Sequence, residues 1–181
     1  MIVESERIID SIIQLADKEG WSRMTVRSIS KKIGYSTIKI YSDYGSKENL
    51  LLEIQKGGFQ KINKKYNEAK IEGGINEENL VNVSCAHVLF SQENKALYDL
   101  MYSLNGANCI EGAFETKRKV AQVIQQFLDP LHPYDKNTIF FHYYALIHGL
   151  AITIRDIKLL KNNDLSEYVR LAIQNFIKGI N

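Results

Sequence analysis

Hydrophobic residues recur at the spacing of amphipathic α-helices over almost the whole chain. Between residues 5 and 19, for example, Ile8, Ile12, Leu15 and Ala16 fall on one helical stripe. Further helices are expected near residues 25–34, 36–42, 46–70, 77–91, 94–104, 111–128, 136–160 and 165–178, with a clear break at Gly73-Gly74. The pattern therefore predicts an all-α fold.

Three hydroxyl residues mark helix starts in the first third of the chain. Thr25, Ser36 and Ser46 each precede an apolar stripe, and their side-chain oxygens suit the free N–H groups of a first helical turn. Gly20 ends the helix that comes before Thr25, and Gly34 ends the helix that comes before Ser36. Three capped helices with a very short middle member have the proportions of a helix-turn-helix.

The stretch from Ile139 to Ile157 is apolar on most of its helical faces, and residues 165–178 carry a further apolar face. Such helices must be buried on most faces. A four-helix interface between two copies of the chain explains this surplus. A central helix buried within one chain is the alternative.

Composition narrows the class of protein. The chain has 181 residues, of which 45% are hydrophobic and 24% charged, which is typical of a globular protein. Cys85 and Cys109 are too few for a disulfide framework and too isolated for a zinc site. There is no apolar run of about 18 residues, and Glu4 and Glu6 stand where a signal peptide needs bases. We expect a cytoplasmic protein without membrane contact.

Charge is unevenly distributed along the chain. Residues 22–65 contain ten bases and three acids, although the net charge of the whole chain is only +2. A basic segment in a balanced chain is typical of a module that binds a polyanion. A solvated lysine-rich helix face is the alternative.

The residues of this segment closely resemble a known DNA-binding domain. The resemblance is carried by Thr25-Val26-Arg27-Ser28-Ile29-Ser30, Ile33-Gly34-Tyr35-Ser36 and Ile40-Tyr41-Ser42-Asp43-Tyr44-Gly45-Ser46-Lys47-Glu48-Asn49-Leu50. Over about residues 5–52 they are similar to TetR-family transcriptional regulators. The resemblance implies a three-helix helix-turn-helix domain at residues 1–50, linked through helix 46–70 to a helical ligand-binding and dimerisation domain at residues 51–181.

The resemblance also implies DNA contacts at individual positions. The residues expected to contact phosphates are Thr25, Tyr41 and Lys47. The residues expected to contact bases are Arg27, Thr37, Ile38 and Ser42. Two further residues of the expected interface are Ser36 and Lys39. The alternative for Tyr41 is an aromatic side chain of the core. The alternative for Lys47 is a solvated residue in the first turn of its helix.

Three positions depart from the family pattern. Ile38 and Lys39 stand where small or hydroxyl residues are usual, and Asp43 stands where an aromatic residue or histidine is common. Lys39 replaces a hydroxyl contact to phosphate with a charged one. Asp43 opposes phosphate binding unless it pairs with Lys39 one turn away.

In the second domain the resemblance implies dimerisation through the last two helices and a ligand pocket. The expected dimer residues are Ile147, Leu150, Ala151, Ile154, Tyr168, Ala172 and Phe176. The expected pocket residues are His87, Phe90, Tyr98, Met101, Tyr102, Phe114 and His142, for which an ordinary core is the alternative. Residues 105–108 suit a segment that moves on ligand binding.

Catalytic motifs are absent from the sequence. His142 and His148 do not have the spacing of a metal-binding pair, and Cys85 and His87 diverge by about 200° on a helix. We expect no catalytic residue, metal or cofactor. The function predicted is a homodimeric, ligand-responsive repressor that binds a two-fold symmetric double-stranded operator. There are two alternatives. One is a co-activator that binds another protein, and the other is a small-molecule sensor whose DNA-binding domain is inactive.

Overall fold

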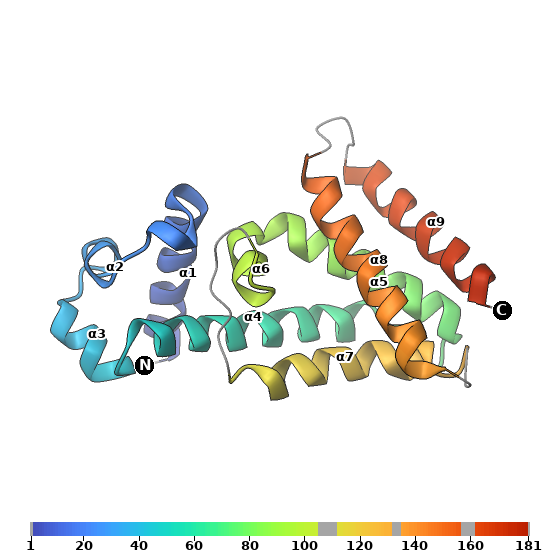
Figure 1. Ribbon diagram of the computed structural model, residues 1–181, viewed down its shortest axis with the longest axis horizontal. Coiled ribbons are helices and arrows are strands. Elements are labelled where there is room, and N and C mark those ends of the chain that lie inside the picture. The colour runs from blue at the N-terminus through green and yellow to red at the C-terminus, as the bar shows by residue number, and fades with distance from the viewer. Residues whose placement is uncertain (1, 105–111, 132–134, 157–161, 181) are drawn as a thin grey trace. The chain divides into compact units, whose positions relative to one another are not determined.

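Helices make up the regular structure of residues 2–104, 112–131, 135–156 and 162–180, which are the residues that the structure describes (Figure 1). In this computed structural model the helices are α1 (Ile2–Glu19), α2 (Val26–Ile33), α3 (Thr37–Tyr44), α4 (Lys47–Ala69), α5 (Asn76–Glu93), α6 (Lys95–Met101), α7 (Phe114–Leu128), α8 (Lys136–Asp156) and α9 (Asn162–Ile180), with a 3-10 turn at Trp21–Arg23. The all-α prediction is confirmed.

The helices form two compact units. The first unit contains Met1–Phe59 and Asn94–Lys117, and the second contains Gln60–Glu93 and Arg118–Asn181. The chain passes between the units within α4, between α5 and α6, and within α7. The break expected at Gly73-Gly74 is a turn inside the second unit, because both helices that it joins contribute to the core of that unit.

Two expected helices are shorter in the structure. The helix expected over residues 94–104 is α6, which ends at Met101, and the helix expected over residues 111–128 begins at Phe114. Residues 105–108, where movement was expected, and Cys109 lie outside the described residues.

Trp21 joins α1 to α6 in the first unit. Its ring is buried, and its Nε1 donates a hydrogen bond to the carbonyl oxygen of Ala96 at 2.7 Å. The N–H of Ala96 in turn donates to Oδ1 of Asp17 at 3.1 Å. Asp17 therefore satisfies one of the free N–H groups in the first turn of α6, as a capping side chain does.

The inner face of α4 is the one that the sequence predicts. Leu50, Leu51, Ile54, Ile62 and Tyr66 are all buried. The helix continues through the two adjacent glycines at positions 57 and 58 without a break.

In the second unit α5 packs against both α8 and α9 (Figure 1). The hydroxyl of Ser84 on α5 donates to the carbonyl oxygen of Leu80 at 2.6 Å and lies 2.8 Å from the hydroxyl of Tyr143 on α8. Because the Ser84 proton is directed to Leu80, Tyr143 is the donor to Ser84. Burial raises the pKa of the Tyr143 hydroxyl well above its usual value, so it stays protonated.

Within the described part of the chain, none of the helices is long and apolar enough to cross a membrane.

Candidate nucleic-acid interface

The ends of α2 are held by the residues that the sequence marks as caps. Oγ1 of Thr25 accepts a hydrogen bond from the N–H of Ser28 at 3.1 Å, and Oγ of Ser28 accepts one from the N–H of Thr25 at 3.0 Å. Gly34 then ends the helix with a φ of 73°, a left-handed conformation that favours glycine. The turn between α2 and α3 is thus specified by local sequence.

α3 is a short helix with one buried and one outward side. Oγ of Ser36 accepts from the N–H of Lys39 at 3.1 Å and caps its start. Ile40 is fully buried and anchors the helix to the core. At 100° per residue, Ile38 and Ser42 lie opposite Ile40, and Ile38 is 79% exposed. The outward side is thus free for contact with another molecule.

Tyr41 and Lys47 flank this outward side. The ring of Tyr41 is 52% exposed, so the alternative of a core aromatic is wrong. Nζ of Lys47 donates a hydrogen bond to the carbonyl oxygen of Met24, which ties the first turn of α4 to the segment before α2. An ammonium has three donors, so Lys47 keeps capacity for a further acceptor.

The remaining interface residues also lie at the surface of the first unit. Thr25, Arg27, Ser36, Lys39 and Ser42 are exposed, and Thr37 is partly buried. All nine predicted DNA contacts therefore lie on α2, α3, their caps and the first residue of α4, and none is taken up by the core.

The part of the chain that carries these residues matches the model of a known protein family. Residues 8–54 match the model for bacterial regulatory proteins of the tetR family. This match covers α2, α3 and the start of α4, which carry the predicted DNA contacts. No curated protein sequence matches the chain.

Solved TetR-family structures share the fold of the whole chain. The TetR-family regulator PfmR from Thermus thermophilus is 17% identical with a TM-score of 0.73, covering 97% of this chain and 99% of its own. A TetR-like regulator from Rhodococcus sp. RHA1 is 14% identical with a TM-score of 0.78, covering 99% and 98%. The regulator SCO4454 from Streptomyces coelicolor is 13% identical with a TM-score of 0.71, covering 98% and 95%. The chain therefore has the fold of these TetR-family structures.

The expected pocket residues are divided between the two units. In the second unit His87 and Phe90 are buried, whereas His142 lies at the surface. In the first unit Tyr98 and Met101 are buried, the Tyr98 ring lies 4.6 Å from that of Tyr102, and Phe114 is 72% exposed. Within each unit only part of the set is therefore buried.

A cluster of rings around His87 was missed at the sequence level. The hydroxyl of Tyr66 is hydrogen-bonded to Nδ1 of His87, whose ring meets His148 edge-on at 5.1 Å. The ring of Tyr144 lies 4.2 Å from that of His148. Burial, and secondarily the nearby His148, holds the pKa of His87 well below its usual value, so His87 is neutral at pH 7.

One sequence signal pointed toward this cluster. Tyr66 falls on the apolar face of α4, and a buried tyrosine hydroxyl usually needs a hydrogen-bond partner. The identity of the partner depends on how α4 packs on α5, which no local pattern of residues specifies.

The expected dimer residues need correction. Ile147, Ala151 and Ile154 are buried within one chain, so they are not available to a second copy. The carbonyl oxygen of Ala151 accepts from Nε2 of Gln92 on α5 at 3.0 Å, because this side of α8 faces α5. Of the other expected residues, Tyr168 is exposed and Leu150, Ala172 and Phe176 are partly buried. The exposed large apolar side chains of α8 and α9 are Phe141, Ile152, Tyr168 and Leu171.

Proposed function

We propose that this TetR-family protein is a homodimeric, ligand-responsive repressor that reads a two-fold symmetric operator in double-stranded DNA. The observation that carries the proposal is the outward side of α3, where Ile38, Tyr41 and Ser42 are exposed on a capped two-turn helix. A helix of this kind fits the major groove. The protein would act in the cytoplasm, at the nucleoid when bound to DNA.

Base reading is assigned to four side chains. The guanidinium of Arg27 suits the O6 and N7 atoms of guanine, and Ile38 suits a thymine methyl group. The hydroxyls of Thr37 and Ser42 serve either donors or acceptors on base edges. An operator rich in thymine opposite Ile38 is expected.

Phosphate binding is assigned to residues on the flanks of α3 and at helix starts. Thr25, Tyr41 and Lys47 hold phosphate oxygens by a hydroxyl, a phenol and an ammonium. Ser36 places the free N–H groups of the first turn of α3 at the surface, where phosphate also binds. Lys39 adds a charge to this flank. The proposed DNA-binding domain is residues 1–50, and residues 51–181 bind the ligand and dimerise.

Dimerisation is assigned to the exposed sides of α8 and α9. Phe141 and Ile152 on α8 and Tyr168 and Leu171 on α9 are large apolar side chains that water does not favour. Packing α8 and α9 against the same helices of a second copy buries them in a four-helix interface, with the partly buried Leu150, Ala172 and Phe176 at its edge. Two reading helices would then meet half-sites about 34–36 Å apart.

Ligand binding is assigned to the second unit, near the rings of His87, Phe90, Tyr144 and His148, with His142 at the surface. Aromatic walls with a few polar atoms are typical of small-molecule sites. Tyr98, Met101, Tyr102 and Phe114 belong to the first unit and are not assigned to this site. A ligand changes the affinity of the protein for DNA only if it binds the DNA-bound protein and the DNA-free protein with different affinities.

The test is a selection from random duplex DNA at two salt concentrations, with the variants Tyr41→Phe and Ile38→Ala alongside. We expect enrichment of an inverted repeat for the unmodified chain, loss of affinity without change of motif for Tyr41→Phe, and loss of a thymine preference for Ile38→Ala. Binding that is salt-sensitive and selects no motif would mean phosphate contact without base reading. That outcome would refute the proposal and favour a co-activator or sensor.

A further inference from the structure

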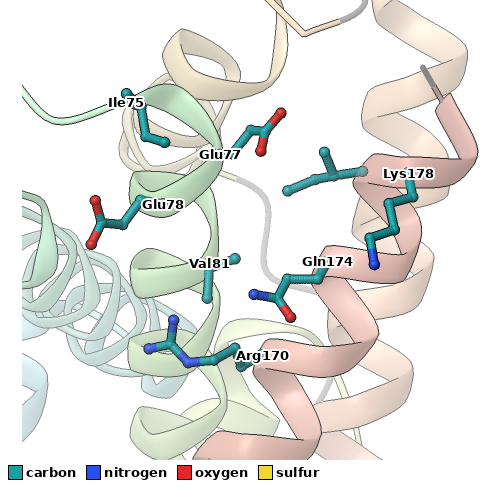
Figure 2. A pocket seen from close by; sticks show the side chains of 8 residues that line it. Ile75, Glu77, Glu78, Val81, Arg170, Gln174 and Lys178 are labelled. Atoms are coloured by element: carbon teal, nitrogen blue, oxygen red, sulfur yellow. The ribbon is translucent and has the colours of Figure 1, made fainter.

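A pocket of about 350 Å³ lies between the N-terminal part of α5 and the C-terminal part of α9 (Figure 2). Both helices belong to the second unit. The side of α5 contributes Ile75, Glu77, Glu78 and Val81. The pocket lies at the lower end of the size range of small-molecule sites, which is about 300–1,000 Å³.

The opposite side is formed by a stripe of α9. Arg170, Gln174 and Lys178 follow one another at intervals of four residues, so they lie on one side of the helix. Figure 2 shows the amide of Gln174 in the gap and the guanidinium of Arg170 reaching toward α5, while the carboxylate of Glu77 points into the gap from α5. Val81 and Ile177, both buried, supply apolar surface at the base.

The α5 side is held in place before any ligand binds. Oδ1 of the buried Asn79 accepts from the N–H of Ile71 at 2.6 Å, and its Nδ2 donates to the carbonyl oxygens of Ile71 at 3.0 Å and Gly74 at 3.3 Å. These bonds fix the loop that carries Ile75. A preformed wall reduces the entropy that a ligand must lose on binding.

The α9 stripe and the proposed dimer face overlap only at one edge. Tyr168 lies on another side of α9 than Arg170 and Gln174, because successive residues turn by 100°. Leu171 lies seven residues before Lys178 and therefore on nearly the same side of the helix. A second copy packed on Leu171 would therefore lie beside Lys178, at the edge of the pocket.

We infer that this pocket binds a small zwitterion with an aliphatic portion, namely a free aliphatic amino acid or a short peptide of such residues. An ammonium group of the ligand meets Glu77, whose carboxylate points into the gap, its carboxylate meets Lys178 on the opposite wall, and its aliphatic part covers Val81 and Ile177. A ligand with a single charge would leave the opposite wall without a counter-charge. The inference does not depend on DNA binding.

The test is titration of the full chain with L-leucine and with leucyl-leucine, followed by calorimetry and by ¹⁵N NMR. N-acetyl-leucine lacks the ammonium group and leucine methyl ester lacks the carboxylate. We expect either change to weaken binding by about tenfold or more, as loss of a charged hydrogen bond does. The side-chain amide signal of Gln174 is expected to shift, and the tighter of the two zwitterions identifies the source as amino acid or peptide.

Matched variants separate the pocket from general charge effects. Glu77→Gln and Lys178→Gln are expected to weaken binding by about tenfold. Glu68→Gln and Lys64→Gln remove the same charges from an exposed pair on α4 and should leave binding unchanged. All four positions are exposed, so thermal melting should confirm intact folding. Absence of binding by both zwitterions, equal binding of the two blocked derivatives, or shifts confined to the His87 cluster would each overturn the inference.

Discussion

Lys39 and Asp43 form an ion pair across one turn of α3, with Nζ of Lys39 2.9 Å from Oδ2 of Asp43. The same ammonium lies 5.0 Å from the centre of the Tyr35 ring. Asp43 and Lys39 both depart from the TetR pattern, and the charge of Lys39 thus neutralises that of Asp43. The pair leaves the outward side of α3 to Ile38 and Ser42.

Removing the acid of this pair is expected to strengthen DNA binding. In Asp43→Asn the Lys39 ammonium loses its partner and gains a phosphate, so the affinity should rise severalfold at low salt. The slope of log affinity against log salt should steepen by about one. Lys39→Gln should shift both quantities in the opposite direction. Fluorescence anisotropy of a labelled duplex over a salt series measures both, and weaker binding by Asp43→Asn would contradict the prediction.

Loss of the Thr25 hydroxyl from the capping box of α2 is expected to destabilise the protein. Thr25→Ala removes the acceptor for the Ser28 N–H and should lower the free energy of unfolding by about 1 kcal/mol. Thr25→Ser keeps the hydroxyl and should retain most of the stability. Urea denaturation of the three proteins compares them, and Ser22→Ala at an exposed position nearby serves as the control.

The two adjacent glycines of α4 should respond to alanine with opposite signs. A Cβ at Gly58 would lie 2.6 Å from Sδ and 2.8 Å from Cγ of the buried Met101, so Gly58→Ala forces repacking between α4 and α6. We expect a loss of about 1–3 kcal/mol. At Gly57 nothing lies within 4 Å of the added Cβ, so Gly57→Ala should stabilise the helix by up to about 1 kcal/mol. Equal effects in thermal melting would show that the close approach at Gly58 is unimportant.

The buried His87 predicts a loss of stability in acid. Its pKa is lowered by burial in the folded state, so only the unfolded chain takes up a proton on this side chain as the pH falls below about 6.5. Between pH 7.5 and 5.5 this uptake should lower the free energy of unfolding by up to about 1.4 kcal/mol. His87→Gln should lack this part of the pH dependence. Urea denaturation at both pH values tests it, and an unchanged dependence in the variant would place the effect in another group.

The exposed apolar residues of α9 predict the behaviour of the proposed dimer. Leu171→Asp places a charge in the four-helix interface, and its burial there is unfavourable. We expect this variant to sediment as a folded monomer at concentrations where the unmodified chain sediments as a dimer. Ile71→Asp is the matched control, since Ile71 is also exposed and apolar but lies in the loop before α5. A monomeric unmodified chain would refute the dimer.

Local sequence determined the architecture of the DNA-binding end. Thr25, Ser36 and the glycine at position 34 act on backbone groups within a few residues of themselves, so their effects are readable from spacing alone. The apolar stripe of α4 was equally readable, because one side of a helix recurs every three or four residues. The pairing of Lys39 with Asp43 followed from the same spacing.

Tertiary packing alone decided which apolar and polar groups meet. α8 is apolar on several sides, and only its contact with α5 shows that Ile147 and Ala151 are buried within the chain while Phe141 stays exposed. The bond between Tyr66 and His87 and the pocket between α5 and α9 likewise join distant stretches of sequence. Periodicity specifies that a side chain is buried, whereas the neighbour that buries it depends on how whole helices pack.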